Sequence, residues 1–177
     1  DDVLKLNSEQ FLAVFAATHS SLMFLSGGPG TGKTSITVCL LRLLKRLGLA
    51  THPMLAAPTG RAAKRMSESI AASLGSIQDL ESLDFDKELL ESTDASQTLH
   101  RLLGFHPGMG RFQAHEYAPL EGDLILVDEA SMIDLSLMQR LLRAMDSKLP
   151  YLPPVQQMIL IGDSRQLPPV KSGIIID

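Results

Sequence analysis

The stretch Gly27–Thr34 constrains this chain more than any other, because it fits the pattern Gly-x-x-x-x-Gly-Lys-Ser/Thr at every constrained position. The short apolar run Leu22–Leu25 precedes it and indicates a buried strand, and Ser35–Leu47 follows with apolar residues at helical spacing. Glycines let the backbone turn tightly and aim several N–H groups at one point, where the N-terminus of the next helix adds positive potential. The pattern therefore predicts a phosphate site between a strand and a helix.

Each part of this loop has its own expected role. The Lys33 ammonium group can reach the terminal phosphates of a nucleotide, and the Thr34 hydroxyl can ligate Mg²⁺. The loop residues expected to bind the nucleotide are Gly28, Pro29, Gly30, Thr31, Gly32, Lys33 and Thr34. ATP and Mg²⁺ are the cofactors that follow from this arrangement.

A second strand is predicted to deliver acidic side chains to the same place. Asp123–Val127 is an apolar run that ends at Asp128 and Glu129, and ligands of doubly wound α/β folds bind at the carboxyl ends of the strands. Asp128 can hold Mg²⁺ through water, and Glu129 can orient or deprotonate an attacking water. The alternative is an ordinary helix cap by Asp128. A further predicted strand leads to Gln166, which can touch a terminal phosphate.

Two other features have both a functional and a plain interpretation. Gln10 lies on a predicted first helix, where its amide can recognise an adenine edge or be merely exposed. Arg61, Lys64 and Arg65 gather at the start of a helix predicted to follow the strand Pro53–Ala57. The helix dipole disfavours cations there, so they indicate an anionic partner such as a nucleic-acid backbone, or simply a solvated face.

Composition limits the classes of protein to which the chain can belong. It has 177 residues, 45% of them hydrophobic, which is enough for one domain with a sizeable core. With a formal charge of −4, any nucleic-acid contact must be local. A single cysteine excludes an internal disulfide. Because no apolar run could span a bilayer and no signal peptide opens the chain, we expect a cytoplasmic protein without membrane contact.

We expect the chain to form one α/β domain over residues 1–177. Within it, residues 75–97 carry seven acidic residues against the single cation Lys87, which predicts an acidic surface insertion. Residues 173–177 look like the entry to another element, which predicts that the chain is a fragment of a longer protein.

Several polar stretches occur in an order that resembles a known family. They are Gly27–Thr34, Ala57–Ala63, Thr98–Gly104, Val127–Leu135 and Gly162–Val170. This order resembles motifs I, Ia, Ib, II and III of superfamily 1 helicases, and the residues are most similar to RecD-type DNA helicases. Thr98–Gly104 and Asp128–Leu135 in particular resemble the alpha subunit of exodeoxyribonuclease V, which is RecD of the RecBCD enzyme.

The resemblance implies a RecA-like P-loop NTPase domain, an α/β fold with a mainly parallel sheet and helices on both faces. It also implies ATP-driven 5′ to 3′ movement along single-stranded DNA, a role in double-strand break repair and recombination, and RecB and RecC as partner subunits. By matching positions, Gln10 reads adenine, Lys33 acts on the phosphates, Thr34 and Asp128 hold Mg²⁺, Glu129 is the catalytic base, and Gln166 is a phosphate sensor. The residues expected to contact DNA are Pro58, Thr59, Thr98 and His100, together with Arg61.

Other interpretations stay open. Leu167–Val170 also occurs in free-standing RecD-like and Pif1-like helicases. A nucleotide-dependent switch or assembly module would not need Glu129, and a small-molecule kinase would need a lid with arginines where residues 75–97 are acidic. Motifs IV, V and VI do not occur, so we expect this chain alone to hydrolyse ATP poorly, because arginines of a second domain stabilise the transition state in such enzymes.

Overall fold

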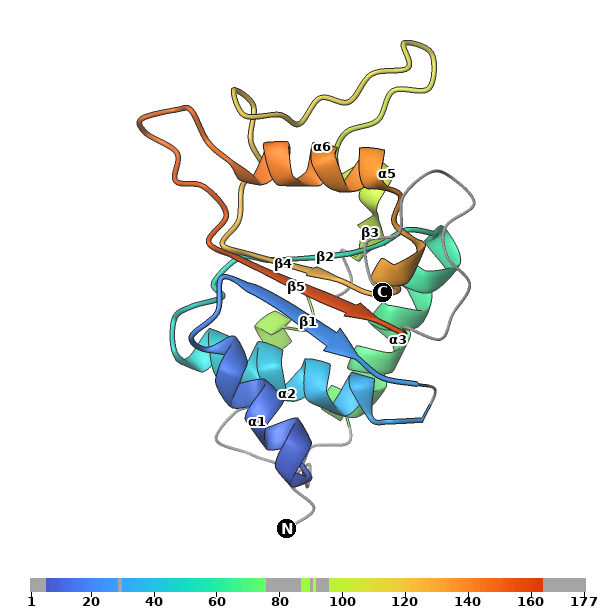
Figure 1. The fold of residues 1–177 in the computed structure, drawn as a ribbon, viewed down its shortest axis with the longest axis vertical. Helices are drawn as coiled ribbons and strands as arrows, with labels where there is room; N and C mark the ends of the chain where they lie inside the picture. Colours follow the sequence, from blue (N-terminus) through green and yellow to red (C-terminus); the bar gives the residue numbers. More distant parts are fainter. Residues whose placement is uncertain (1–5, 29, 76–86, 90, 92–95, 164–177) are drawn as a thin grey trace.

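The computed structural model describes residues 6–28, 30–75, 87–89, 91 and 96–163. Within them the strands form one five-stranded parallel sheet in the order β1-β5-β4-β2-β3 (Figure 1). The strands are β1 Leu22–Ser26, β2 Pro53–Ala57, β3 Gln97–Thr98, β4 Leu124–Val127 and β5 Gln157–Gly162. The helices are α1 Ser8–Ala17, α2 Lys33–Arg46, α3 Gly60–Gly75, α5 Leu99–Leu102, the 3-10 helix η2 Ala130–Met132 and α6 Leu135–Met145.

Helices cover both faces of the sheet, with α1 and α2 on one side and α6 on the other (Figure 1). The strand β4 shows how the two layers are built, because successive side chains of a strand point to opposite faces. Leu124 and Leu126 belong to the core that includes the α1 and α2 residues, whereas Ile125 and Val127 belong to the core under α6. All four are fully buried, as expected for a central parallel strand with both faces covered.

The helix ends follow the local sequence. Asn7 caps α1 in a capping box, in which its side chain accepts from the Gln10 backbone N–H and the Gln10 side chain accepts from Asn7. The Asp134 side chain caps α6 by accepting from Leu137 N–H, and Thr98 caps α5. These caps satisfy donors that a helix leaves without partners at its first turn.

The predicted acidic insertion is only partly described. Leu89 is 1% exposed and belongs to the core beneath the sheet, and Glu88 forms an ion pair with Lys45 of α2 at 2.8 Å. At least this part of the segment therefore packs against α2. No helix in the described part of the chain is long and apolar enough to cross a membrane.

Because the strands are parallel, the carboxyl ends of β1, β2, β4 and β5 lie at one edge of the sheet. The predicted α/β architecture is confirmed, with a RecA-like parallel sheet between two helical layers. The glycine loop after β1 and the acidic pair Asp128 and Glu129 after β4, which are far apart in the chain, therefore lie at the same edge.

Candidate functional site

The glycine loop after β1 has the geometry that its sequence demands. Gly30 and Gly32 have φ angles of +76° and +82°, a region that side chains with a Cβ atom rarely adopt. Gly32 is also the N-cap of α2, so the loop leads directly into the helix N-terminus. A Cβ at this position would lie 2.6 Å from Nε2 of Gln10, which packs against the loop. The loop therefore requires glycine here for both its conformation and its packing.

The side chains of Lys33 and Gln10 both fix the loop by hydrogen bonds to its backbone. Lys33 Nζ donates hydrogen bonds to the carbonyls of Gly27 and Gly28, so its ammonium group lies within the loop that carries it. Gln10 Nε2 donates to the Thr31 carbonyl at 3.1 Å, which ties α1 to the loop. The structure thus places Gln10 beside the predicted phosphate site, and its role toward adenine stays a prediction.

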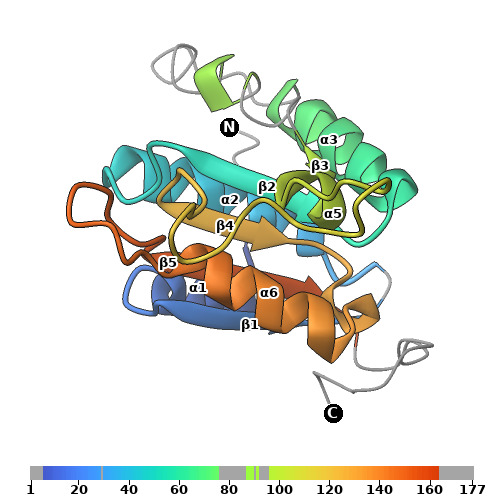
Figure 2. The ribbon, with the colours of Figure 1, turned by 90° about the horizontal axis from the view of Figure 1, so that it is seen from above.

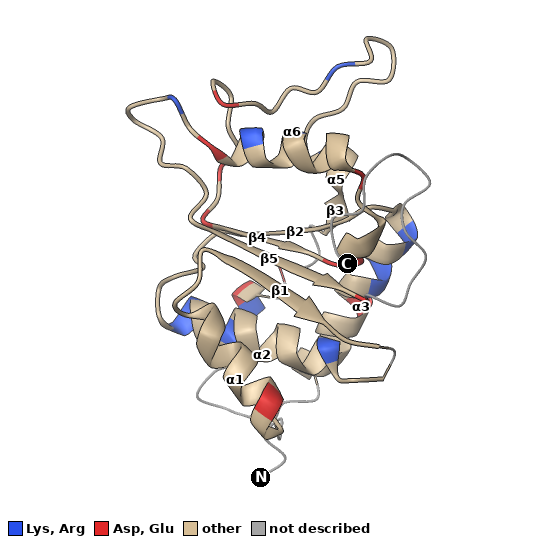
Figure 3. Ribbon diagram, in the orientation of Figure 1, with Lys and Arg blue, Asp and Glu red and all other residues tan. Residues whose placement is uncertain are grey.

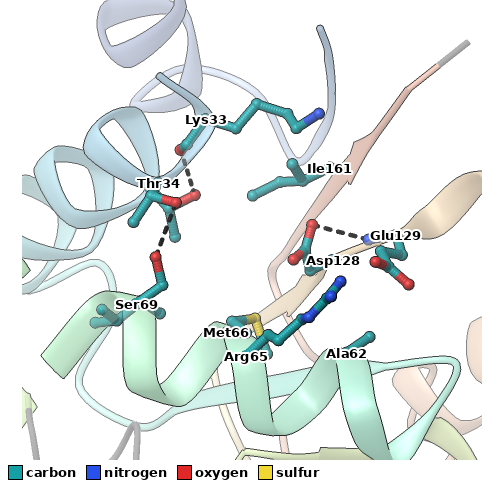
Figure 4. Close-up of a pocket in the computed structure, with 11 residues that line it drawn as sticks. Lys33, Thr34, Ala62, Arg65, Met66, Ser69, Asp128, Glu129 and Ile161 are labelled. Carbon is teal, nitrogen blue, oxygen red and sulfur yellow. Dashed lines mark hydrogen bonds between the residues drawn. The ribbon is translucent and has the colours of Figure 1, made fainter. Parts of the chain in front are cut away.

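A cavity of about 370 Å³ adjoins this loop and brings together the two halves of the predicted site (Figure 4). Its lining residues are Lys33, Thr34, Thr37, Ala62, Arg65, Met66, Ser69, Ile70, Asp128, Glu129 and Ile161. Lys33 and Thr34 come from α2, and Asp128 and Glu129 follow β4. Lys33 and Thr34 therefore share one cavity with the acidic pair. The other predicted nucleotide-binding residues in the described part of the chain do not line it, namely Gln10, Gly28, Gly30, Thr31 and Gly32.

Asp128 is held in position by its neighbour in the chain. Its Oδ1 accepts a hydrogen bond from the Glu129 backbone N–H at 2.8 Å. Burial raises the pKa of the Asp128 carboxyl, although this hydrogen bond and the nearby Lys33 charge act in the opposite direction. A cation bound beside this carboxyl group would favour its ionised form and lower its pKa.

The donor atoms in this cavity fit Mg²⁺. The Thr34 hydroxyl and the Asp128 carboxylate are hard oxygen ligands, and Mg²⁺ is usually held by one or two carboxylates together with substrate phosphates and water. No group of three or more His, Cys, Asp or Glu side chains suited to a metal occurs among the residues that the structure describes. The site therefore fits a metal that shares its ligands with a phosphate.

Glu129 has a strained backbone. Its φ and ψ angles are 51° and 39°, in the left-handed region, and it is the one non-glycine residue with positive φ in the described part of the chain. Such a conformation disfavours a residue with a long side chain, and strained residues cluster at active sites. This observation is independent of the sequence motif and supports a functional role for Glu129.

The helix α3 supplies a wall of the cavity that the sequence analysis did not identify. Arg65, Met66 and Ser69 line the cavity, and Ser69 Oγ donates a hydrogen bond to Thr34 Oγ1 at 3.1 Å (Figure 4). The spacing of Arg65 and Ser69 places both on one face of a helix. Only the packing of α3 against α2 shows that this face is directed to the nucleotide loop.

A second cavity of about 370 Å³ lies between α3 and α5, where β3 adjoins both helices (Figure 2). Its lining residues are Gly60, Ala63, Lys64, Ser67, Glu68, Ser96, Gln97, Thr98 and Arg101. Figure 3 colours the Lys and Arg positions along the α3 ribbon blue, and Arg61, Lys64 and Arg65 are exposed. We refer to this cavity as the α3–α5 groove.

Of the predicted DNA-contacting residues, Thr98 lines this groove, whereas Pro58, Thr59, Arg61 and His100 do not. Thr98 is in the groove, and its hydroxyl accepts from the Arg101 backbone N–H at 3.2 Å. The Thr59 hydroxyl accepts from Ala62 N–H at 3.2 Å at the start of α3, where Arg61 is exposed. Lys64 and Arg101 are the cations that line the groove.

His100 belongs to an aromatic cluster and does not line the groove. Its ring lies 5.4 Å from the ring of Phe105 and 5.6 Å from that of Phe112, and Arg140 of α6 lies over Phe112 at 4.7 Å. Pro58 is half-buried between β2 and α3. Pro29 and Gln166 lie outside the described residues, so their predicted roles are not located in the structure.

A protein-family model described as an AAA domain matches residues 10–172. The chain belongs to the AAA domain family. This AAA domain is 38% identical to the RecBCD enzyme subunit RecD of Haemophilus influenzae over 169 residues, covering 94% of this chain and 25% of that protein. It is also 36% identical to the ATP-dependent RecD2 DNA helicase of Deinococcus radiodurans, covering 96% of this chain and 19% of the other. The predicted resemblance to RecD-type proteins is thus confirmed.

Solved structures agree on the fold. The AAA domain resembles Bacteroides Pif1 bound to ssDNA, with a TM-score of 0.56 and 22% identity over 97% of this chain and 34% of that one. Pif1 helicase from Candida albicans gives a TM-score of 0.52 at 23% identity, covering 96% of this chain and 35% of that one. At such identity the likeness describes the architecture alone. The chain spans about a quarter of the length of the Haemophilus RecD subunit.

Proposed function

We propose that this AAA domain is the ATP-binding motor domain of a RecD-type 5′ to 3′ DNA helicase. The observation that carries the proposal is the cavity that Lys33 and Thr34, at the end of the glycine loop, share with the acidic pair after β4. Its relatives include proteins named as RecD subunits and an ATP-dependent DNA helicase. By this proposal the protein is cytoplasmic, acts in double-strand break repair and recombination as the alpha subunit of exodeoxyribonuclease V, and assembles with RecB and RecC.

The proposed chemistry assigns a task to each side of the cavity. The loop N–H groups and Lys33 bind the phosphates of ATP, because the α2 N-terminus and the ammonium group both attract negative charge. Thr34 and Asp128 hold Mg²⁺, which neutralises charge on the phosphates when bound. Glu129 orients a water molecule and accepts its proton as that water attacks the terminal phosphate. Because Asp128 and Glu129 are adjacent in the chain, the metal ligand and the proton acceptor keep a fixed position relative to each other.

The proposed DNA contact lies in the α3–α5 groove. Lys64 and Arg101 are exposed there, and phosphate contacts of this kind bind single strands without regard to sequence. Each lost phosphate contact reduces the salt dependence of binding by about one unit of the log–log slope.

The acid pair and the groove are tested separately. Glu129→Gln in the whole protein should abolish DNA-stimulated ATP hydrolysis but leave ATP binding intact, since it removes the proton acceptor and preserves shape. If hydrolysis persists in this variant, Glu129 is not the proton acceptor. If the unaltered protein binds ATP but shows no DNA-stimulated hydrolysis, the helicase proposal fails and a nucleotide-dependent switch becomes the better interpretation.

For the groove, fluorescence anisotropy with a labelled single-stranded oligonucleotide at two salt concentrations compares charge reversals. Lys64→Glu and Arg101→Glu, and Arg61→Glu beside them, should weaken binding, whereas Lys87→Glu in the acidic segment should not. Single strands should be preferred over duplex of the same sequence. Equal losses in all four variants, or in none, would show that DNA does not occupy this groove.

A further inference from the structure

The proposed chemistry leaves the α3 wall of the nucleotide cavity without a function. Ser69 lines the cavity from the middle of α3, and its Oγ lies 3.1 Å from Oγ1 of Thr34. The two residues are 35 positions apart in the chain and belong to different helices. Figure 4 shows Ser69 directed at Thr34 across the gap between α3 and α2.

We propose that Ser69 is a positioning residue that orients the hydroxyl of Thr34 for metal binding. This inference rests on the proposed function, in which Thr34 is a ligand of Mg²⁺. A threonine hydroxyl has one hydrogen to donate and two lone pairs to offer. When one lone pair binds a cation, the hydrogen must point to another acceptor, and the Ser69 oxygen lies at the right distance to accept it.

The direction of the hydrogen bond can reverse without any movement of heavy atoms. In this structure Ser69 donates to Thr34, and a reversal needs only that both hydroxyl hydrogens rotate. In either direction the bond restricts rotation of the Thr34 side chain, so its oxygen keeps one orientation in the cavity. Residues that orient metal ligands in this way typically change metal affinity by about 10- to 100-fold when removed.

The helix context makes a clean substitution possible. Ser69 is a partly buried residue of α3, and alanine is the better helix former, so Ser69→Ala should fold normally. Ser73 is one turn further along α3 and does not line the cavity, which makes Ser73→Ala the matched control. Ser69→Thr restores the hydroxyl with one added methyl group.

The experiment measures the affinity for a fluorescent ADP analogue with and without Mg²⁺. Ser69→Ala should weaken binding by about ten-fold in Mg²⁺ and leave binding in EDTA unchanged. Ser73→Ala should match the unaltered protein in both conditions, and Ser69→Thr should recover most of the loss. In a Thr34→Ala background, Ser69→Ala should have no further effect, because its influence passes through the Thr34 hydroxyl.

The outcomes separate this inference from the proposed function. If Lys33→Ala binds the ADP analogue as well as the unaltered protein does, the nucleotide site itself is wrong. If Lys33→Ala and Thr34→Ala lose affinity while Ser69→Ala does not, only the positioning role is wrong. An equal loss by Ser69→Ala in Mg²⁺ and in EDTA would also overturn the positioning role, since it would show a general structural effect.

Discussion

The left-handed backbone of Glu129 predicts that glycine at this position stabilises the fold while removing its chemistry. A non-glycine residue in this region carries roughly 1–2 kcal/mol of strain, which glycine does not have. Glycine also gains freedom in the unfolded chain, which offsets about 0.4–1 kcal/mol of that gain. Glu129→Gly should therefore raise the free energy of unfolding by about 0.5 kcal/mol, with a range from no change to roughly 1.5 kcal/mol.

Urea unfolding followed by circular dichroism measures this change, and Gln139→Gly is the matched control. Gln139 is exposed in the interior of α6, where a glycine should lower the free energy of unfolding by about 0.5–1 kcal/mol. Glu129→Gln keeps the strained backbone and should leave stability unchanged. If Glu129→Gly is destabilised as much as Gln139→Gly, the backbone at Glu129 carries no strain and the independent support for its role disappears.

Three other predictions follow from the structure. Asp123→Asn should destabilise the protein near neutral pH. Burial tends to raise the pKa of Asp123, but hydrogen bonds from the Thr51 side chain and from backbone N–H groups stabilise its carboxylate and lower the pKa overall. A lowered folded pKa gives stability that is present above the unfolded value and is lost as pH falls through the folded one, so urea unfolding should show the deficit shrinking below about pH 4. Leu126→Ala should lower the free energy of unfolding by about 2–5 kcal/mol in the same assay, because this fully buried side chain leaves a cavity in the central strand. Gly32→Ala should abolish binding of the ADP analogue and lower the melting temperature, since a Cβ there meets both positive φ and the Gln10 amide.

The sequence predicts the elements of this fold well because each signal is local. The apolar run Asp123–Val127 contains the central strand β4, and the glycine loop requires a helix at its end, where α2 begins. The strand order could not be read from the sequence in the same way. Strand order depends on which apolar faces pack together over long chain separations, and the spacing of apolar residues within a segment does not contain that information.

Site residues that belong to a sequence motif could be predicted. Site residues that reach the cavity only through the packing of helices could not. Lys33, Thr34 and Asp128 carry motif positions, and they meet in one cavity. Ser69 has no sequence signal, because a serine in the middle of a helix is usually a surface residue. Only the packing of α3 against α2 in the structure places Ser69 beside Thr34.

The central claim is that the loop Gly27–Thr34 binds a nucleotide through its phosphates, and calorimetric titration with ATP or ADP in the presence of Mg²⁺ tests it most directly. The unaltered protein should bind at one site with a measurable heat. Lys33→Ala should show no binding at the same concentrations, because it removes both the cation expected to contact the phosphates and the hydrogen bonds that Lys33 donates to the loop. Identical titration curves for the two proteins would contradict the account.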